Sequence, residues 1–399
     1  MNRMKHLIII LSIYLINSLF ASDIEKDLQI QFILAEPGDT IIIPQGIHQI
    51  KGTLSIDGKK DIIIRGFGMD KSILSFSNQE EGAQGLSITN SSNITLEDFS
   101  VKDTKGDAIK TQYVDGIIFR GITVEWSGGP KPTNGAYGLY PVQCSNILIE
   151  FCVAIGASDA GIYVGQSREI IVRNSKAFHN VAGIEIENSI NAEVYENHSY
   201  ENTGGILVFD LPDLVQTKGD NVHIYQNLIE NNNIDNFAPP GNIVGKVLPG
   251  TGVMILAANN VHVYDNTIRN NNSVGTGIVS YYITEEAMTD KTYNPYTSNI
   301  HVYNNTYERQ VSLPTLDYEI GQLIAIKYGR TIPDIIYDGM QDPKETIGLC
   351  LQNNIKAGFT NLDIEHNFEN WYSPFISNFS EDKSLHKCLK NHIPYSNSY

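Results

Sequence analysis

The sequence predicts an all-β fold, a right-handed parallel β-helix, on the strength of three observations. First, the pattern Asn-h-x-h-x-x-Asn, with h apolar, recurs along the chain. Second, its period is about one solenoid turn, since Asn146, Glu169 and Asn191 are spaced 23 and 22 residues apart. Third, Gly and Asn gather where each strand ends, and both tolerate left-handed backbone. Such repetition is typical of a solenoid, in which each turn buries its apolar face against its neighbours.

Two strands are predicted in each turn. The strict copies of the pattern begin at Asn191, Asn221, Asn260, Asn299 and Asn361, and looser copies at Asn93, Gly116, Asn146 and Glu169. Apolar residues alternate in each copy, as in a strand with one buried face. A second strand follows the glycine of each turn, and its predicted inward residues are Ile109, Leu139, Ile162, Ile184, Ile206, Val253 and Ile278.

Residues 1–21 have the features of a secretory signal peptide. Arg3 and Lys5 precede an apolar run that ends near Ala21. A run of about 13 residues is too short to cross a bilayer core of roughly 30 Å. We therefore expect a secreted or periplasmic protein that does not insert into a membrane once the signal is removed.

The remaining chain divides into two predicted parts. Residues 22–310 form the β-helix domain with loop insertions, and an amphipathic helix near its start covers the open end of the solenoid. Residues 311–399 form the last coils and an irregular C-terminal cap. Four insertions rich in Pro, Gly, Asn and Tyr are expected to interrupt the coils, at residues 127–136, 211–219, 233–250 and 283–298.

The charge and the cysteines limit the partners. The chain has 45 Asp and Glu against 28 Lys and Arg, a net charge of −17, which falls to −19 without Arg3 and Lys5. This excess of negative charge argues against a nucleic-acid partner. Export permits a disulfide, which we expect between Cys350 and Cys388. Neither this pair nor the other two cysteines, Cys144 and Cys152, have metal-site spacing. The sequence indicates no metal site, no cofactor and no particular oligomeric state.

Outward positions of the second strand form two columns, because equivalent residues of successive turns stack about 4.8 Å apart. The first column is predicted to be Lys110, Tyr140, Tyr163, Glu185, Leu207, Met254 and Val279. The second is predicted to be Gln112, Val142, Gly165, Glu187, Phe209, Leu256 and Tyr281. The C-terminal half of this face is apolar and needs a cover, for which the insertions at 233–250 and 283–298 are the candidates.

The polar half of this face has a chemical interpretation. Removing the proton α to a uronate carboxylate requires a base, a neutralising cation and an acid. Lysine, tyrosine and carboxylate side chains can supply all three, so the candidate catalytic residues are Lys110, Tyr140, Tyr163 and Glu185. The candidate substrate-binding residues are Gln112, Glu187, Arg168, Phe209 and Tyr281. The alternative is a solvated, charge-balanced sheet face on which the tyrosines stack.

Two segments resemble a known group of proteins. Pro37-Gly-Asp-Thr-Ile-Ile-Ile-Pro44 and Asp159-Ala-Gly-Ile-Tyr-Val-Gly165 look like the opening and central coils of right-handed parallel β-helix proteins of the polysaccharide lyase and mannuronan C5-epimerase type. The resemblance covers roughly residues 23–310. It implies this fold, whereas lyases, epimerases, hydrolases and binding proteins all share the scaffold.

One motif permits a comparison residue by residue. Tyr137-Gly-Leu-Tyr-Pro-Val142 resembles the epimerase motif Tyr-Gly-Phe-Asp-Pro-His. Tyr137 matches and joins the catalytic candidates, whereas Tyr140 and Val142 stand where the epimerases have their catalytic Asp and His. Lys110 lies one turn upstream, in the region where such enzymes place a lysine. Lyases of this fold often use Ca²⁺, so a bound Ca²⁺ ion stays open as an alternative to a protein without a cofactor. The candidate Ca²⁺ ligands are Asp107, Asp159 and Asp210.

Three functions stay open from the sequence. The leading hypothesis is an exported carbohydrate-active protein, a lyase or epimerase acting on a uronate-containing polysaccharide. The second is a β-helix that binds a glycan or an envelope partner without catalysis. The third is a periplasmic accessory factor, supported only by the shared outward position of His223, His262 and His301.

Overall fold

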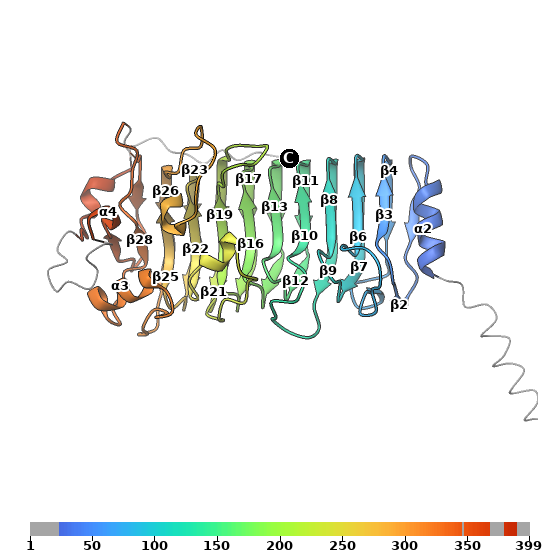
Figure 1. The fold of residues 1–399 in the computed structure, drawn as a ribbon, viewed down its shortest axis with the longest axis horizontal. Coiled ribbons are helices and arrows are strands. Elements are labelled where there is room, and N and C mark those ends of the chain that lie inside the picture. Colours follow the sequence, from blue (N-terminus) through green and yellow to red (C-terminus); the bar gives the residue numbers. More distant parts are fainter. Residues whose placement is uncertain (1–23, 345–346, 368–378, 389–399) are drawn as a thin grey trace, which may run out of the picture.

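The computed structural model describes residues 24–344, 347–367 and 379–388, and these form a single stack of parallel β-helix turns (Figure 1). The turns follow one another along the long axis, from helix α2 (Ile24–Leu34) at one end to α3 (Glu319–Tyr328) and α4 (Ile364–Asn367) at the other. The predicted fold class and N-terminal helix are thus confirmed. The predicted signal peptide lies outside the described residues.

One wall of the stack is an eleven-stranded parallel sheet. Its strands, in spatial order, are β3 (Leu54–Asp57), β6 (Leu86–Thr89), β8 (Ile109–Gln112), β10 (Tyr137–Val142), β13 (Ala160–Gly165), β16 (Ala182–Glu187), β19 (Gly204–Phe209), β22 (Thr251–Leu256), β25 (Val274–Val279), β28 (Ile335–Tyr337) and β30 (Phe359–Asn361).

A nineteen-stranded sheet bends around the rest of each turn. Its first limb contains β1 (Thr40–Ile42), β4 (Lys60–Arg65), β7 (Ser92–Lys102), β9 (Asp115–Glu125), β11 (Ser145–Glu150), β14 (Arg168–Arg173), β17 (Ile190–Tyr195), β20 (Asp220–Tyr225), β23 (Asn259–Tyr264), β26 (Ser298–Tyr303) and β29 (Cys350–Gln352). Its second limb contains β2 (Gly46–Gln49), β5 (Ser72–Ser75), β12 (Val153–Ile155), β15 (Lys176–Phe178), β18 (His198–Tyr200), β21 (Leu228–Glu230), β24 (Thr267–Arg269) and β27 (Thr306–Glu308). Strands β7 and β9 run through both limbs.

The register confirms the predicted strand phase over most of the stack. Ile184 pairs with Ile162 on one side and with Ile206 on the other, and all three are fully buried. Ile109, Leu139 and Val253 continue this inward row.

The phase predicted for β25 is wrong by two residues. Gly275, not Gly277, takes the glycine position, so Thr276 pairs with Val253. In the sequence both Gly275 and Gly277 could take the glycine position, and the polar Thr276 does not match the apolar residue expected at an inward position. Its buried hydroxyl is 2.7 Å from that of Tyr307, which satisfies both groups inside the stack. In consequence Val279 pairs with Leu256 and belongs to the second outward column, not the first.

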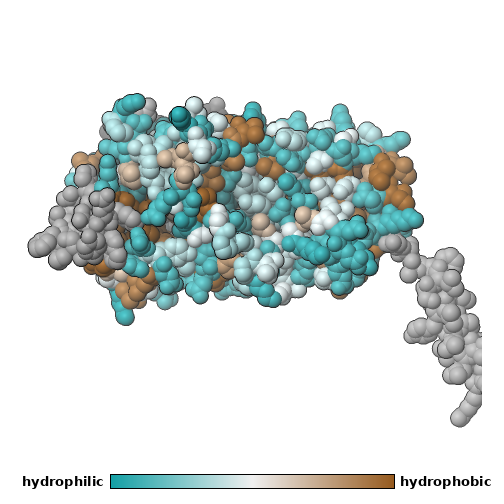
Figure 2. Space-filling model, in the orientation of Figure 1, coloured by the Kyte–Doolittle hydropathy of each residue, from teal (hydrophilic) through white to brown (hydrophobic). Residues whose placement is uncertain are grey.

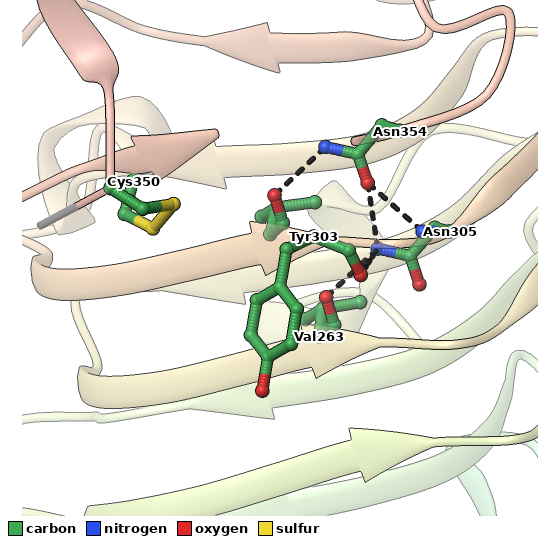
Figure 3. Close-up of a disulfide and its surroundings, with 7 residues drawn as sticks. Val263, Tyr303, Asn305, Cys350 and Asn354 are labelled. Atoms are coloured by element: carbon green, nitrogen blue, oxygen red, sulfur yellow. Dashed lines mark hydrogen bonds between the residues drawn. A yellow bond between two sulfur atoms is a disulfide. The ribbon is translucent and has the colours of Figure 1, made fainter. Parts of the chain in front are cut away.

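Two ladders of buried asparagines tie the turns together at the corners. One contains Asn197, Asn227, Asn266, Asn305 and, at its end, the partly exposed Asn354; the other contains Asn180, Asn202, Asn232 and Asn271. In each ladder the side-chain oxygen of one Asn accepts hydrogen bonds from the backbone N–H and the side-chain amide of the preceding Asn. Figure 3 shows this arrangement at Asn305 and Asn354, near the Cys350–Cys388 disulfide.

Helix α2 covers the first turn with both apolar and polar groups. Leu28 and Phe32 are buried against the core. The side-chain amide of Gln29 donates to Ser55 O and accepts from Ser55 N, both at 2.9 Å. The Glu25 carboxylate accepts the backbone N–H groups of Lys51 and Gly52 at 2.7 and 2.8 Å. The helix therefore supplies hydrogen bonds that a further strand would otherwise make.

Among the residues that the structure describes, three short 3₁₀ helices lie outside the strands: η1 (Ile243–Lys246), η2 (Tyr281–Thr284) and η4 (Lys383–His386). The first belongs to the 233–250 insertion and the second leads into the 283–298 insertion. Both insertions lie over the outer face of the eleven-stranded sheet, where they pack on Leu207, Phe209 and Leu256. The cover expected from the sequence is therefore present.

Replacing Ile184 with Asp should prevent folding. The side chain is fully buried, and an unpaired charge there costs several kcal/mol out of a typical total stability of about 5–15 kcal/mol. The control is Ile171→Asp, which alters an outward, partly exposed position of β14. Soluble expression and far-UV circular dichroism measure the outcome. A stable, β-rich Ile184→Asp protein would contradict the strand phase.

Replacing Asn266 with Ala should lower the free energy of unfolding by at least about 2–4 kcal/mol. The change removes the side chain that accepts from Asn227 and donates to Ile224 O and Asn305, and it leaves buried polar groups without partners. Urea unfolding would measure the loss. Asn78→Ala is the matched control, because the exposed Asn78 donates only a long side-chain hydrogen bond of 3.3 Å to Gln49.

Candidate functional site

Four consecutive turns of the eleven-stranded sheet place the candidate residues on one outer face. Lys110 of β8 pairs with Tyr140 of β10, and Tyr163 of β13 pairs with Glu185 of β16. The parallel register between β10 and β13 brings Tyr140 next to Tyr163. The first outward column predicted from the sequence is therefore continuous from Lys110 to Glu185.

Three tyrosines form a compact cluster at the centre of this face. The ring centroids of Tyr137 lie 4.5 Å from those of Tyr140 and 4.4 Å from those of Tyr163, and Tyr140 and Tyr163 are 5.0 Å apart. The Lys110 ammonium lies over the Tyr140 ring, 5.0 Å from its centroid, where a cation is attracted to the ring face. Tyr137 and Tyr140 are partly exposed, whereas Tyr163 is only 4% exposed.

Three buried carboxyl groups lie behind the tyrosines. The Tyr163 hydroxyl donates to Glu187 at 2.6 Å. Asp159 accepts a hydrogen bond from the Asn242 amide at 3.1 Å and lies next to Tyr137. Glu185 is 3% exposed, and its Oε2 has no hydrogen-bond partner among the described residues. Burying such a group without a hydrogen-bond partner costs much more free energy when it is a carboxylate than when it is a neutral acid.

Burial makes these groups weak acids. Desolvation, together with the charge of Glu187, raises the pKa of Asp159 to about 8. Desolvation raises the pKa of Glu187 to about 7, although the Tyr163 hydrogen bond opposes the change. The pKa of Glu185 is raised well above its usual value by desolvation and by the charges of Asp159 and Glu187. At neutral pH this group of carboxyls therefore holds protons.

Asp107 is the carboxyl group on the accessible side of the site. It is partly exposed, lies two residues before β8 and accepts a hydrogen bond from the Tyr137 backbone N–H at 3.3 Å. Partial burial raises its pKa, and the charge of Lys110 opposes that change. Asp107, Lys110, Tyr137 and Tyr140 are thus the partly exposed polar groups, whereas Tyr163 and Glu185 lie beneath them.

The 233–250 insertion forms one wall over the buried part. Asn242 of this insertion donates a hydrogen bond to Asp159. Val244 and Val247, also of this insertion, are buried in the same apolar cluster as Phe209. The 283–298 insertion adds Tyr293, whose hydroxyl donates to Asp210 O at 2.6 Å. Desolvation raises the pKa of the Asp210 carboxyl to about 7, and the Gly219 backbone N–H donates to it.

Several candidate substrate-binding residues lie away from the tyrosine cluster. Arg168 begins β14 on the other sheet, is exposed and donates to Gln216 at 3.4 Å. Gln112 ends β8 and donates to Gln143 at 2.7 Å. Tyr281 follows β25 in η2, is 4% exposed and packs edge-on against Tyr293. The assignment of Tyr281 to the second outward column is wrong, because the predicted register of β25 is displaced by two residues. Phe209 does lie in that column, next to Glu187, but is buried.

Two contributors were not identified as part of this site from the sequence. The sequence predicts Asp159 only as a candidate Ca²⁺ ligand, although it directly precedes the strand that bears Tyr163. Asn242 lies 83 residues further along the chain within an irregular insertion, and no local pattern predicts its contact with Asp159.

The histidine column is a stack of rings. His223, His262 and His301 lie parallel, with centroids 4.6 and 4.4 Å apart. Within the described parts of the chain, no group of three or more His, Cys, Asp or Glu has the geometry to hold a metal ion. The same residues contain no helix long and apolar enough to cross a membrane.

The buried carboxyls should make the protein less stable as the pH rises. In the unfolded chain these groups titrate near pH 4, and in the folded protein Glu187 and Asp159 titrate near 7 and 8. Between these values the native state binds more protons, so the free energy of unfolding falls with increasing pH. Glu187→Gln should reduce this fall by roughly 1–3 kcal/mol. Urea unfolding at pH 5 and at pH 8 measures the change in the free energy of unfolding between the two pH values. The control is Glu36→Gln, which alters an exposed carboxylate. An unchanged pH dependence in Glu187→Gln would contradict the assignment.

Comparisons with known proteins agree with this architecture. The family model "Right handed beta helix region" matches residues 84–233. No curated protein sequence matches the chain.

Two solved structures extend the similarity. The A-module of the mannuronan C-5 epimerase AlgE4 from Azotobacter vinelandii is 16% identical, with a TM-score of 0.52, and the match covers 83% of this chain and 89% of that one. The A-module of AlgE6 from the same organism is 15% identical, with a TM-score of 0.50 and coverage of 84% and 90%. At this identity the likeness concerns the fold. Together with the parallel register of its turns, it shows that the chain is a right-handed parallel β-helix protein.

Proposed function

We propose that this protein is an exported enzyme that acts on a uronate-containing polysaccharide, by β-elimination or by epimerisation at C5. The observation that carries the proposal is the cluster of Lys110 and three tyrosines over buried carboxyl groups, on a sheet face walled by insertions. The similar structures named as mannuronan C-5 epimerases support the substrate class only through the shared fold.

The accessible residues can divide the chemistry among them. Both reactions begin with removal of the C5 proton, which the neighbouring uronate carboxylate acidifies once a cation neutralises it. We assign this neutralisation to the Lys110 ammonium. Asp107 is the candidate base, because a carboxylate with a raised pKa is a stronger base than an exposed one. Burial raises the pKa of Tyr140, which keeps its hydroxyl protonated as a proton donor.

The buried residues have a supporting role in this proposal. Glu187 accepts a hydrogen bond from the Tyr163 hydroxyl and so fixes its position, and Asp159 lies next to Tyr137. Because burial raises the pKa of Glu187 to about 7 and that of Asp159 to about 8, these carboxyls are partly or mostly protonated at neutral pH, which lowers the negative charge of the face. This reduces the electrostatic repulsion that a chain of net charge −17 would exert on an anionic substrate.

Three substitutions test the proposal. Lys110→Ala, Asp107→Asn and Tyr140→Phe should each lower turnover about 10²–10⁴-fold, because each removes a positioned charge, base or acid. Melting temperatures should change little, since these side chains are partly exposed. Tyr225→Phe is the matched control, because it removes a tyrosine hydroxyl from an outward position of the other sheet.

The assay uses a panel of acidic polysaccharides. Absorbance of unsaturated uronate reports elimination, and proton NMR of the polymer reports inversion at C5. Binding without turnover, unaffected by the three substitutions, would contradict the enzyme proposal and favour a glycan-binding protein. That alternative is supported by the cover over Tyr163 and Glu185, which limits access to them.

A further inference from the structure

A cavity lies on the C-terminal half of the eleven-stranded sheet, apart from the tyrosine cluster. Its volume is about 430 Å³, within the range of small-molecule sites. Its floor is the outer face of β22, β25 and β28, and its walls are η1, η2 and the start of α3. Figure 2 shows hydrophobic side chains (brown) between hydrophilic ones (teal) in this half of the molecule. In Figure 1, drawn in the same orientation, this half contains β22 and β25.

The interior of the cavity is mostly apolar, although the buried Asp338 and Thr251 also line it. It is lined by side chains that include Met254, Leu256, Val279, Ile283, Ile324 and Ile336. The hollow depends on Gly277, which takes the outward position opposite Met254 where earlier turns carry Leu207 or Glu185. A Cβ at Gly277 would meet only Val274 at 3.3 Å and Val253 O at 3.9 Å. The Val274 side chain would have to move by a few tenths of an ångström, and a larger side chain at Gly277 would then project into the cavity.

The mouth of the cavity carries an excess of negative charge. Glu285, Asp317 and Glu319 line it and are exposed. Lys246 also lines it, but its ammonium already pairs with Glu286 at 3.2 Å. The N-terminal turn of α3 offsets part of the charge of Glu319. Glu285 follows η2 and lies outside that helix.

Two tyrosines also border the opening. Tyr282 is 41% exposed, and the Tyr318 hydroxyl donates to Gly245 O at 3.2 Å, which leaves its ring beside the cavity. Aromatic rings next to carboxylates favour a weakly hydrated cation over an anion. The opening and the interior therefore select for different parts of one ligand.

We propose that this cavity binds a small amphiphile whose apolar body fills the space above Gly277 and whose cationic head lies among Glu285, Asp317 and Tyr282. The ligand class follows from the apolar lining, the volume and the charge of the mouth. It does not depend on the proposed catalytic function, because the cavity lies beyond the 233–250 insertion from Lys110 and Asp107.

Isothermal titration calorimetry tests the proposal with decyltrimethylammonium and decyl sulfate, both below their micelle-forming concentrations. The wild-type protein should bind one equivalent of the cation, at least about tenfold more tightly than the anion. Gly277→Leu should abolish this binding. Thr95→Leu is the matched control, because it adds similar bulk at an outward position of the other sheet.

Two further variants make the result decisive. Met254→Trp fills the cavity from the neighbouring turn and replaces Gly277→Leu if that variant fails to fold. The combination Glu285→Gln, Asp317→Asn and Glu319→Gln should remove the preference for the cation while leaving the apolar body bound. Absence of saturable binding, or binding that survives a folded cavity-filling variant, would overturn the site. Equal affinity of the wild type for both amphiphiles would overturn the cationic head group.

Discussion

The structure depends on hydrogen bonds between identical positions of successive turns, above all those of the buried asparagines. Each turn is too small to bury an apolar core alone and gains one only when the next turn stacks in register. An Asn at a corner satisfies buried backbone groups and at the same time bonds to the next Asn. A turn displaced by one position would leave these amides unsatisfied, which fixes the register more strictly than apolar contacts can.

This regular frame is what allows the outer face to be irregular. Insertions leave the stack between strands and return to it without altering the register on either side, as at β19 and β22. Residues distant in sequence, such as Asp159 and Asn242, thereby meet on one face. The rigid sheet sets the positions of the tyrosines, and the insertions decide how much of the face is exposed to solvent.

The sequence predicted the repeating part of the structure and failed where repetition stops. Alternating apolar residues were enough to place Ile162, Ile184 and Ile206 inward and Lys110, Tyr140 and Tyr163 outward. The prediction for β25 failed because two glycines compete and because Thr276 is a polar residue whose partner, Tyr307, lies 31 residues away. Arg168 lies apart from the tyrosine cluster because the corner after β13 turns it onto the other sheet. The acidity of Asp159, Glu185 and Glu187 depends on burial under an insertion, which no strand pattern records.

The way in which α2 meets the first turn has a consequence for assembly. The terminal turn of a β-helix exposes a row of backbone donors and acceptors that can recruit strands from another molecule. Gln29 occupies both groups of Ser55, and Glu25 occupies the N–H groups of Lys51 and Gly52. An incoming strand would have to displace these side chains together with the buried Leu28 and Phe32. At this end, addition of further turns from another chain is blocked, and with it the growth of a fibre.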